Sequence, residues 1–114
     1  MKRDLRADAR DILEHAIRAV QPDCAVRAAL TGRTFLGRVV LIAVGKAAWQ
    51  MANTAVQTLP GAVTTGLVIT KYDHVRGDIP GVTCMEAGHP VPDESGFAAT
   101  RRALELVSDL NADD

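Results

Sequence analysis

The stretch Leu41–Ala52 reads LIAVGKAAWQMA and contains the transition that decides the fold. Its first residues belong to a continuous apolar run that begins at Val39, and such a run is typical of a strand covered on both faces in a parallel sheet. Gly45 and Lys46 follow, and an alanine-rich segment then predicts a helix that reaches about Leu59. The sequence therefore predicts a buried strand that turns into a helix at a glycine and a lysine.

The rest of the chain continues the alternation of helices and strands. Spacings of three and four between apolar residues indicate amphipathic helices, and β-branched residues indicate strands. The additional predicted elements are helices over 5–20, 24–30 and 93–110 and strands over 65–70 and 82–87. Pro22 stands just ahead of the second helix, and Asp93 is expected to cap the last one.

This order of elements predicts an α/β fold with a small, largely parallel sheet. In a right-handed βαβ arrangement the last helix would normally return the chain to another strand, and no strand follows it in this sequence. We therefore interpret the sequence as cut short. A small sheet with an uncovered edge would tend to dimerise or exchange elements, so a homodimer is one expected state.

Bulk composition excludes several classes of protein. The 114 residues are 47% hydrophobic and 24% charged, which fits one ordinary domain. A net charge of -1 gives no basis for binding nucleic acid through bulk charge. The N-terminal segment carries charges of both signs, so it lacks the apolar core of a signal peptide, and no membrane span is expected. Cys24 and Cys84 have no CxxC partner, which gives no indication of a zinc cage or a disulfide framework and favours the cytoplasm.

Polar loops follow all three predicted strands, and ligands of open α/β sheets bind at such strand ends. In the first loop, Gly45 would let the backbone approach a ligand and Lys46 would supply a positive charge for a phosphate or carboxylate. Backbone amides of Ala47 and Ala48 would point at the same ligand. The alternative is that Gly45 only makes the turn and that Lys46 is solvated.

The other two loops carry weaker candidates. Lys71 and His74 lie in a polar loop that needs no function. His89 stands directly before Pro90, which biases its backbone to extended conformations, and the bond between them could be cis. Asp93 could act as a base, as a metal ligand or simply as the cap of the last helix. The motifs GxGxxG, GxxxxGK[ST], GxSxG and HExxH do not occur, so the sequence supports neither a dinucleotide fingerprint nor a Walker loop, a nucleophile elbow or a zinc motif.

Four segments together resemble the N-terminal domain of the type-2 glycerate kinases. They read DARDILEHAIRAVQPDCAVRAAL (8–30), VGKAAWQMA (44–52), GLVITKYDH (66–74) and EAGHPVPDESGFAATRRALEL (86–106). The family carries a C-terminal domain known as MOFRL, and its members are often labelled hydroxypyruvate reductases. The similarity extends in order over nearly the whole chain.

This resemblance implies a Rossmann-like three-layer α/β sandwich and the transfer of a phosphoryl group from ATP to D-glycerate, usually giving 2-phosphoglycerate, with Mg²⁺. Lys46 matches the lysine of the family's VGKA motif, and it is the candidate for holding carboxylate or phosphoryl oxygens. Phosphoryl transfer depends on positioning and on neutralising negative charge, which suits an ammonium group. The residues implied to bind substrate are Gly45, Lys46, Lys71, His74, His89, Pro90, Asp93 and Glu94.

Two departures from the family pattern matter. The TKxxH loop of the family often has glycine where this chain has Asp73, and relatives continue into a glycine- and serine-rich loop and a second domain. We therefore interpret residues 1–114 as the N-terminal part of the kinase α/β domain and expect no turnover by this chain alone. Two alternatives remain: an NAD(P)H-dependent hydroxypyruvate reductase, and a non-catalytic module that binds an anion or a partner chain.

Overall fold

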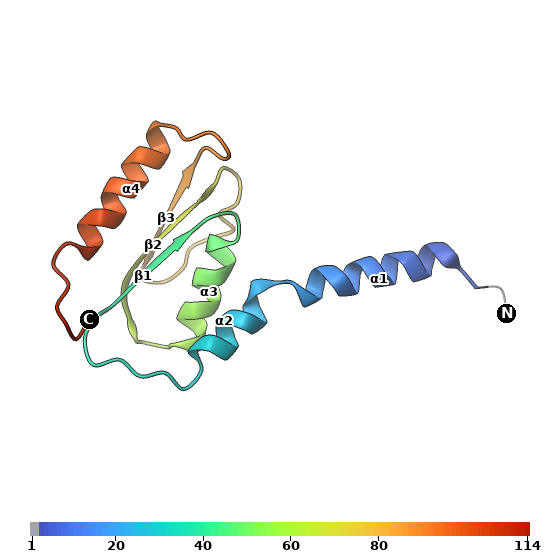
Figure 1. The fold of residues 1–114 in the computed structure, drawn as a ribbon, viewed down its shortest axis with the longest axis horizontal. Coiled ribbons are helices and arrows are strands. Elements are labelled where there is room, and N and C mark those ends of the chain that lie inside the picture. The colour runs from blue at the N-terminus through green and yellow to red at the C-terminus, as the bar shows by residue number, and fades with distance from the viewer. Residues whose placement is uncertain (1–2) are drawn as a thin grey trace.

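The computed structural model describes residues 3–114 and contains all the predicted elements (Figure 1). They are α1 (Leu5–Ala19), α2 (Pro22–Leu30), β1 (Val39–Val44), α3 (Ala48–Thr58), β2 (Val63–Lys71), β3 (Val82–Ala87) and α4 (Glu94–Val107). The bounds of β1 and β3 agree with the prediction. Helix α2 begins earlier than expected because Pro22 occupies its first turn, where a missing N–H costs no hydrogen bond.

The three strands form one wholly parallel sheet in the order β1-β2-β3. Gly66 lies at the centre of this sheet, paired with Leu41 on one side and Val82 on the other. A Cβ atom at this position would come within 2.9 Å of the Val82 side chain. The glycine therefore lets the neighbouring side chains approach the backbone of the central strand.

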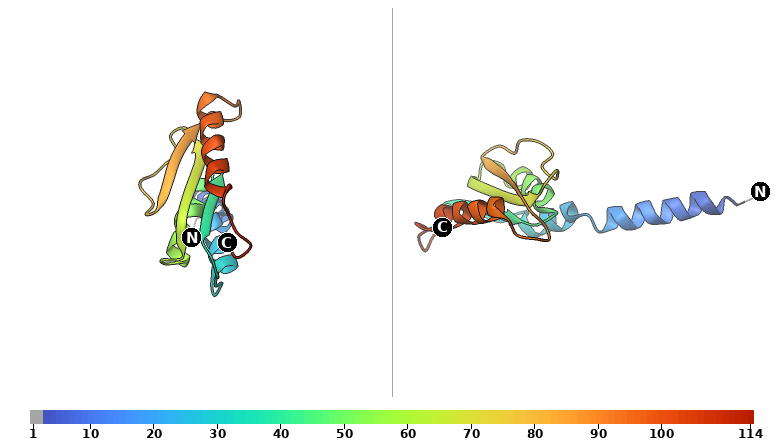
Figure 2. Two further views of the ribbon diagram at one scale, coloured as in Figure 1. Left: turned by 90° about the vertical axis from the view of Figure 1, so that its left-hand side faces the viewer. Right: turned by 90° about the horizontal axis from the view of Figure 1, so that it is seen from above.

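Helices cover both faces of the sheet, which makes the predicted three layers (Figure 2). Successive residues of β2 point to opposite faces. Val68 packs with Ala48 and Ala52 of α3 on one face, while Leu67 packs with Ala99 of α4 on the other. The two buried clusters confirm the Rossmann-like α/β prediction.

Small side chains let the alanine-rich helix α3 lie close to the sheet. Ala48, Ala52 and Ala55 are buried. Ala47 does not share this role, because it precedes the helix as its N-cap residue and is exposed.

The expectation that β1 is covered on both faces is wrong. Leu41 and Ala43 pack beneath α3, but Ile42 and Val44 are 37% and 69% exposed. The reason is that α4 lies mainly against β3 and leaves the Ile42 and Val44 side chains of the outer strand exposed on that face. An apolar groove continues from β1 to α2 and α3, and we call it the β1 surface. Its lining includes Val26, Leu30, Leu41, Ile42, Val44 and Met51.

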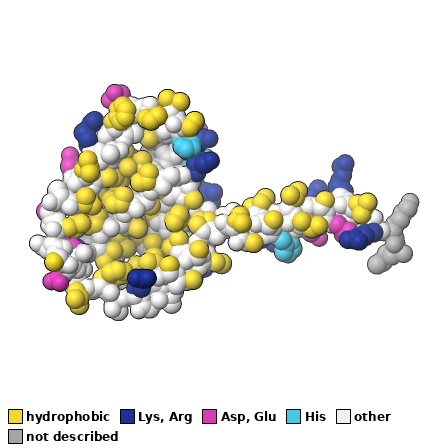
Figure 3. All heavy atoms as spheres, viewed as in Figure 1, with side chains coloured by type: hydrophobic (Ala, Val, Ile, Leu, Met, Phe, Trp, Pro, Cys, Tyr) yellow, Lys and Arg dark blue, Asp and Glu magenta, His cyan; other side chains and the backbone are white. Residues whose placement is uncertain are grey.

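Helix α1 leads away from the body of the molecule (Figure 1). Asp4 caps it by accepting hydrogen bonds from the amides of Arg6 and Ala7. Apolar side chains along the helix stay exposed, and hydrophobic atoms are visible along the projecting arm in Figure 3. Among the described residues no helix combines the length and the apolar character needed to cross a membrane.

The end of the chain returns to the beginning of β1. The Arg38 amide donates a 2.8 Å hydrogen bond to Oδ1 of Asp114, and its guanidinium lies 2.9 Å from Oδ2. The same guanidinium donates to the carbonyl of Asp109 at 2.8 Å. Hydrogen bonds from Asn111 and Arg38 lower the pKa of Asp114 from 3.8 to about 2.

Candidate functional site

The loops that follow the three parallel strands meet at one edge of the sheet, as the sequence predicts. The carbonyl oxygen of Lys46 lies 3.4 Å from Nδ1 of His74, which joins the loop after β1 to the loop after β2. The hydroxyl of Tyr72 donates a 2.7 Å hydrogen bond to Asp93, which joins the loop after β2 to the loop after β3. The three loops therefore form one continuous rim.

Gly45 makes the turn from β1 towards α3. Its φ of 120° lies in a region that residues with a side chain rarely adopt. Its carbonyl accepts hydrogen bonds from the Ala48 amide at 3.1 Å and from the Thr70 hydroxyl at 2.9 Å. The prediction that the Ala48 amide is free to bind a ligand is therefore wrong, because the turn itself uses this donor.

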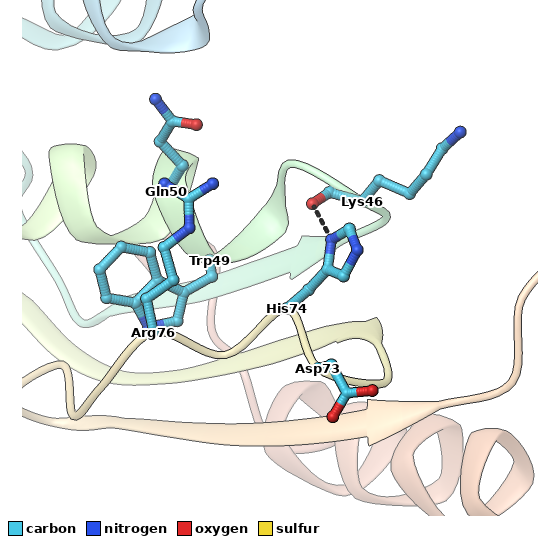
Figure 4. A pocket seen from close by; sticks show the side chains of 6 residues that line it. All are labelled: Lys46, Trp49, Gln50, Asp73, His74 and Arg76. Atoms are coloured by element: carbon cyan, nitrogen blue, oxygen red, sulfur yellow. Dashed lines mark hydrogen bonds between the residues drawn. The ribbon is translucent and has the colours of Figure 1, made fainter.

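Lys46 extends its side chain into solvent. Figure 4 shows its ammonium group pointing away from Asp73, His74 and Arg76. Within residues 3–114 it forms no ion pair. Its contact with the neighbouring loop is made through the backbone, so its role towards a ligand stays a prediction.

The loop after β2 begins one residue later than predicted. Lys71 is the last residue of β2, paired with Ala87, and is not part of the loop. The His74 amide donates to the carbonyl of Lys71 at 3.1 Å and to the carboxylate of Glu86 at 3.2 Å. Asp73, which lies between Lys71 and His74 in the sequence, has a φ of 65°. This left-handed turn brings the His74 imidazole back towards the loop after β1.

Asp93 is the N-cap of α4, which is one of the three roles that the sequence predicts for it. Its carboxylate accepts a 2.9 Å hydrogen bond from the Gly96 amide in addition to the one from Tyr72. The bond from Tyr72, followed by those from backbone amides, lowers the pKa of Asp93. A carboxylate held in its charged form in this way is a poor general base near neutral pH.

The segment before Asp93 is tightly folded. A Cβ atom on Gly88 would lie 2.5 Å from the Val91 carbonyl and 2.9 Å from the Asp93 carboxylate, so only glycine fits. The peptide bond between His89 and Pro90 is cis. Both of these side chains are exposed, as is Glu94 in the first turn of α4.

A polar pocket of about 120 Å³ lies between the first two loops (Figure 4). It is lined by Lys46, Trp49, Gln50, Asp73, His74 and Arg76. Of the predicted substrate-binding residues, only Lys46 and His74 line it. Gly45, Lys71, His89, Pro90, Asp93 and Glu94 lie outside this pocket, most of them along the rim.

Four pocket residues were not predicted to bind substrate: Trp49, Gln50, Asp73 and Arg76. Trp49 and Arg76 are in contact with each other. The guanidinium carbon of Arg76 lies 6.0 Å from the centre of the Trp49 ring, within the range of a cation–π contact. The indole Nε1 of Trp49 donates a 2.9 Å hydrogen bond to the Gly77 carbonyl. A signal was present, because a tryptophan directly after a strand-to-helix turn is well placed to form the wall of a ligand site.

Metal-binding geometry is not found in the part of the chain that the structure describes. Within residues 3–114, no three His, Cys, Asp or Glu side chains gather in a way that could hold a metal ion. Cys24 and Cys84 are both free. Burial raises the pKa of the Cys84 thiol, and the nearby Asp78 carboxylate raises it further.

The chain is similar in sequence to one domain family and to several known proteins. A domain family of unknown function, DUF4147, matches residues 8–114. A D-glycerate 2-kinase of Thermotoga maritima is 49% identical over 104 residues, covering 91% of this chain and 25% of that protein. A protein of Agrobacterium vitis called a putative hydroxypyruvate reductase is 34% identical over 107 residues, covering 92% of this chain and 24% of its own. A glycerate 2-kinase of Pyrococcus horikoshii is 31% identical over 122 residues, covering 97% of this chain and 27% of that protein.

Solved structures give the same result. The crystal structure of glycerate kinase from Thermotoga maritima superposes with a TM-score of 0.84 at 49% identity, covering 93% of this chain and 25% of that one. The PH0495 protein from Pyrococcus horikoshii superposes with a TM-score of 0.78 at 29% identity, covering all of this chain and 28% of that one. This chain thus spans about a quarter of the length of the relatives it matches.

Proposed function

The chain belongs to the DUF4147 family, and from this premise we propose that it provides part of the active site of a D-glycerate 2-kinase. In the proposed reaction a hydroxyl oxygen of D-glycerate attacks the γ-phosphorus of ATP. The bond from that phosphorus to the oxygen of ADP breaks, and the hydroxyl proton is released. The product would be 2-phosphoglycerate.

One observation carries this proposal: the chain is 49% identical to a D-glycerate 2-kinase and shares its fold with a TM-score of 0.84. The rim of loops adds independent support, because it places a small polar pocket where ligands of open α/β sheets bind. A small polar pocket of this kind, lined by cationic side chains, suits a three-carbon hydroxy acid.

Lys46 is the proposed catalytic residue. Phosphoryl transfer is promoted mainly by positioning and by stabilising negative charge on the transferred group. The exposed, flexible side chain of Lys46 can turn from solvent towards the pocket that its own residue lines. We propose that its ammonium group then neutralises substrate carboxylate or phosphoryl oxygens. The rim residues Gly45, Lys71, His74, His89, Pro90, Asp93 and Glu94 would shape the cleft around the substrate.

ATP and Mg²⁺ are the proposed cofactors. Residues 3–114 do not gather three metal-binding side chains, so they do not fit a complete Mg²⁺ site. Mg²⁺ is usually held by one or two carboxylates together with substrate phosphates, and this chain is proposed to contribute substrate contacts only. We therefore derive no step through the metal.

The test is a chimeric kinase. The matched segment of the Thermotoga maritima D-glycerate 2-kinase is replaced by this chain, and glycerate-dependent ADP formation is measured in a coupled assay. The chimera is expected to be active and its Lys46→Ala variant to lose at least about 100-fold in kcat/KM, the loss expected when a charge-stabilising group is removed. Arg101→Gln, an exposed change on α4, is the matched control. A chimera that folds but forms no ADP would contradict the proposal.

The isolated chain is proposed to be inactive, because it spans only about a quarter of the length of the kinase that it matches. Glycerate-dependent ADP formation by the 114-residue chain alone would contradict this.

Reduction of hydroxypyruvate is the second candidate function, favoured by the name of the Agrobacterium vitis relative. NADH oxidation by the chimera with hydroxypyruvate, measured beside the kinase assay, distinguishes the two. A cytoplasmic location stays a prediction from the sequence.

A further inference from the structure

Arg76 is the cation placed most directly against the polar pocket. Its side chain rises along the face of Trp49, so its guanidinium lies beside the pocket that Gln50 also lines (Figure 4). The Lys46 ammonium points the other way, and the Asp73 carboxylate is also directed away from the Trp49–Arg76 pair. The positive charge within the pocket therefore comes chiefly from Arg76.

The loop that carries Arg76 is held at both ends. On one side the His74 amide is bonded to Lys71 and Glu86. On the other side Ile79 is buried against α3, and the Gly77 carbonyl accepts the indole hydrogen bond of Trp49. A cation on a loop fixed in this way can bind an anion without first ordering the backbone, which lowers the entropic cost of binding.

We propose that Arg76, positioned by Trp49, binds the carboxylate of the small hydroxy acid that occupies this pocket. The inference rests on the proposed kinase function and adds a binding residue to it. A guanidinium presents a planar pair of N–H donors that matches the two oxygens of a carboxylate. The guanidinium of Arg76 is available to bind a carboxylate, because within residues 3–114 it forms no ion pair.

Trp49 provides the readout, since it is the single tryptophan of the chain. The 114-residue chain is titrated with D-glycerate, inorganic phosphate and the uncharged analogue glycerol at constant ionic strength. Trp49 emission and the indole N–H signal in a ¹H–¹⁵N spectrum are followed together. Saturable changes are expected with D-glycerate and not with glycerol, because only the former carries a carboxylate.

Variants separate Arg76 from the general charge of the surface. Arg76→Gln should weaken binding of D-glycerate by about 10- to 100-fold, the range expected for losing hydrogen bonds to a charged group. Arg76→Lys should retain only part of the affinity, because an ammonium cannot make the paired contact. Arg101→Gln on α4 carries the same loss of charge and should bind as the parent does. Circular dichroism verifies that each variant is folded, and the indole signal remains usable if the emission of a variant differs.

The possible results are distinct. Equal binding of D-glycerate by the parent and by Arg76→Gln would overturn the role of Arg76 and leave the kinase proposal, which the chimera tests separately, unaffected. Absence of D-glycerate binding by the parent would also overturn it. Phosphate binding that depends on Arg76 without any D-glycerate binding would reject the carboxylate and reassign the pocket to a phosphoryl group. Arg76-dependent binding together with an inactive chimera would retain the anion site and reject the kinase.

Discussion

Asp73 shows how a single backbone angle shapes the site. Its φ of 65° lies in the left-handed region, which glycine adopts freely and aspartate tolerates better than most residues. The turn at Asp73 returns the chain so that His74 contacts the loop after β1. This geometry also explains why glycine suits the same position in sequences with the TKxxH motif.

The effect of a substitution at Asp73 on the free energy of unfolding should therefore depend on how well the new residue adopts the left-handed backbone conformation, and not on its charge. Asp73→Val is expected to lower the free energy of unfolding by about 1–2 kcal/mol, because a β-branched residue is strained in the left-handed region. Asp73→Gly should leave it within about 1 kcal/mol of the parent. Urea denaturation measures both. Asp78→Val, at an exposed position of the same loop with an ordinary φ, should have little effect, and an equal loss there would contradict the argument.

Asp93 at the start of α4 is a second residue whose structural role the sequence predicts. Serine, threonine, asparagine and aspartate before an apolar-periodic segment are strong helix caps, and Asp93 was predicted as one on that basis. The structure adds the hydrogen bond from Tyr72, which couples the cap to the loop after β2. The same carboxylate thus begins a helix and closes the rim.

Removal of this cap should weaken the helix and the rim together. Asp93→Ala is expected to lower Tm by about 4–8 °C, the shift that corresponds to losing an N-cap in a domain of about this size. Tyr72→Phe keeps the cap and removes only the link between loops, so its loss should be smaller. Differential scanning calorimetry compares the two. A larger effect of Tyr72→Phe would show that the link, and not the cap, governs stability.

Elements were predictable from the sequence where the signal is local. The apolar run of β1, the alanines of α3 and the cap of α4 each depend on neighbours in the chain. The exposure of Ile42 and Val44 was not predictable, because it depends on where α4 packs. Arg76 was missed for the same reason: its contact with Trp49 joins positions 27 residues apart, and no spacing rule relates them.

At the scale of the whole molecule, the ion pairs of Arg38 connect the C-terminal segment to β1. The pKa of Asp114 is about 2 in the folded chain against an ordinary value of 3.8. A depressed carboxylate pKa contributes stability that is complete above the ordinary value and is lost as pH falls through the folded one. Arg38 stays charged throughout, so this pH window follows from protonation of Asp114.

The connection should therefore open between about pH 4 and pH 2. Hydrogen exchange at the Arg38 amide is expected to accelerate across this window, because protonation removes the negative charge that pairs with Arg38 and makes Asp114 a weaker acceptor. In Asp114→Ala, which has no acceptor on its side chain, the exchange should be fast at every pH, whereas Asp113→Ala should behave as the parent does. Protection that persists unchanged at pH 2 would show that another group holds the segment.

The β1 surface leads to a further prediction about assembly. Ile42 and Val44 expose apolar area on a strand whose outer edge has no partner in the described chain. Such an edge favours pairing with a second copy. Light scattering should therefore show a dimer that Val44→Lys shifts towards the monomer. Thr83→Lys, on the exposed side of β3, is the control and should leave the mass unchanged, while a monomeric parent would contradict the prediction.

The projecting first helix has a practical consequence. Because α1 leads away from the body, its first turn is remote from the loops that follow the strands (Figure 1). An attachment point in that turn would tether the molecule to a sensor chip at a distance from the polar pocket lined by Trp49 and Arg76. Weakly bound metabolites could then be screened by surface plasmon resonance without the immobilisation chemistry obstructing them.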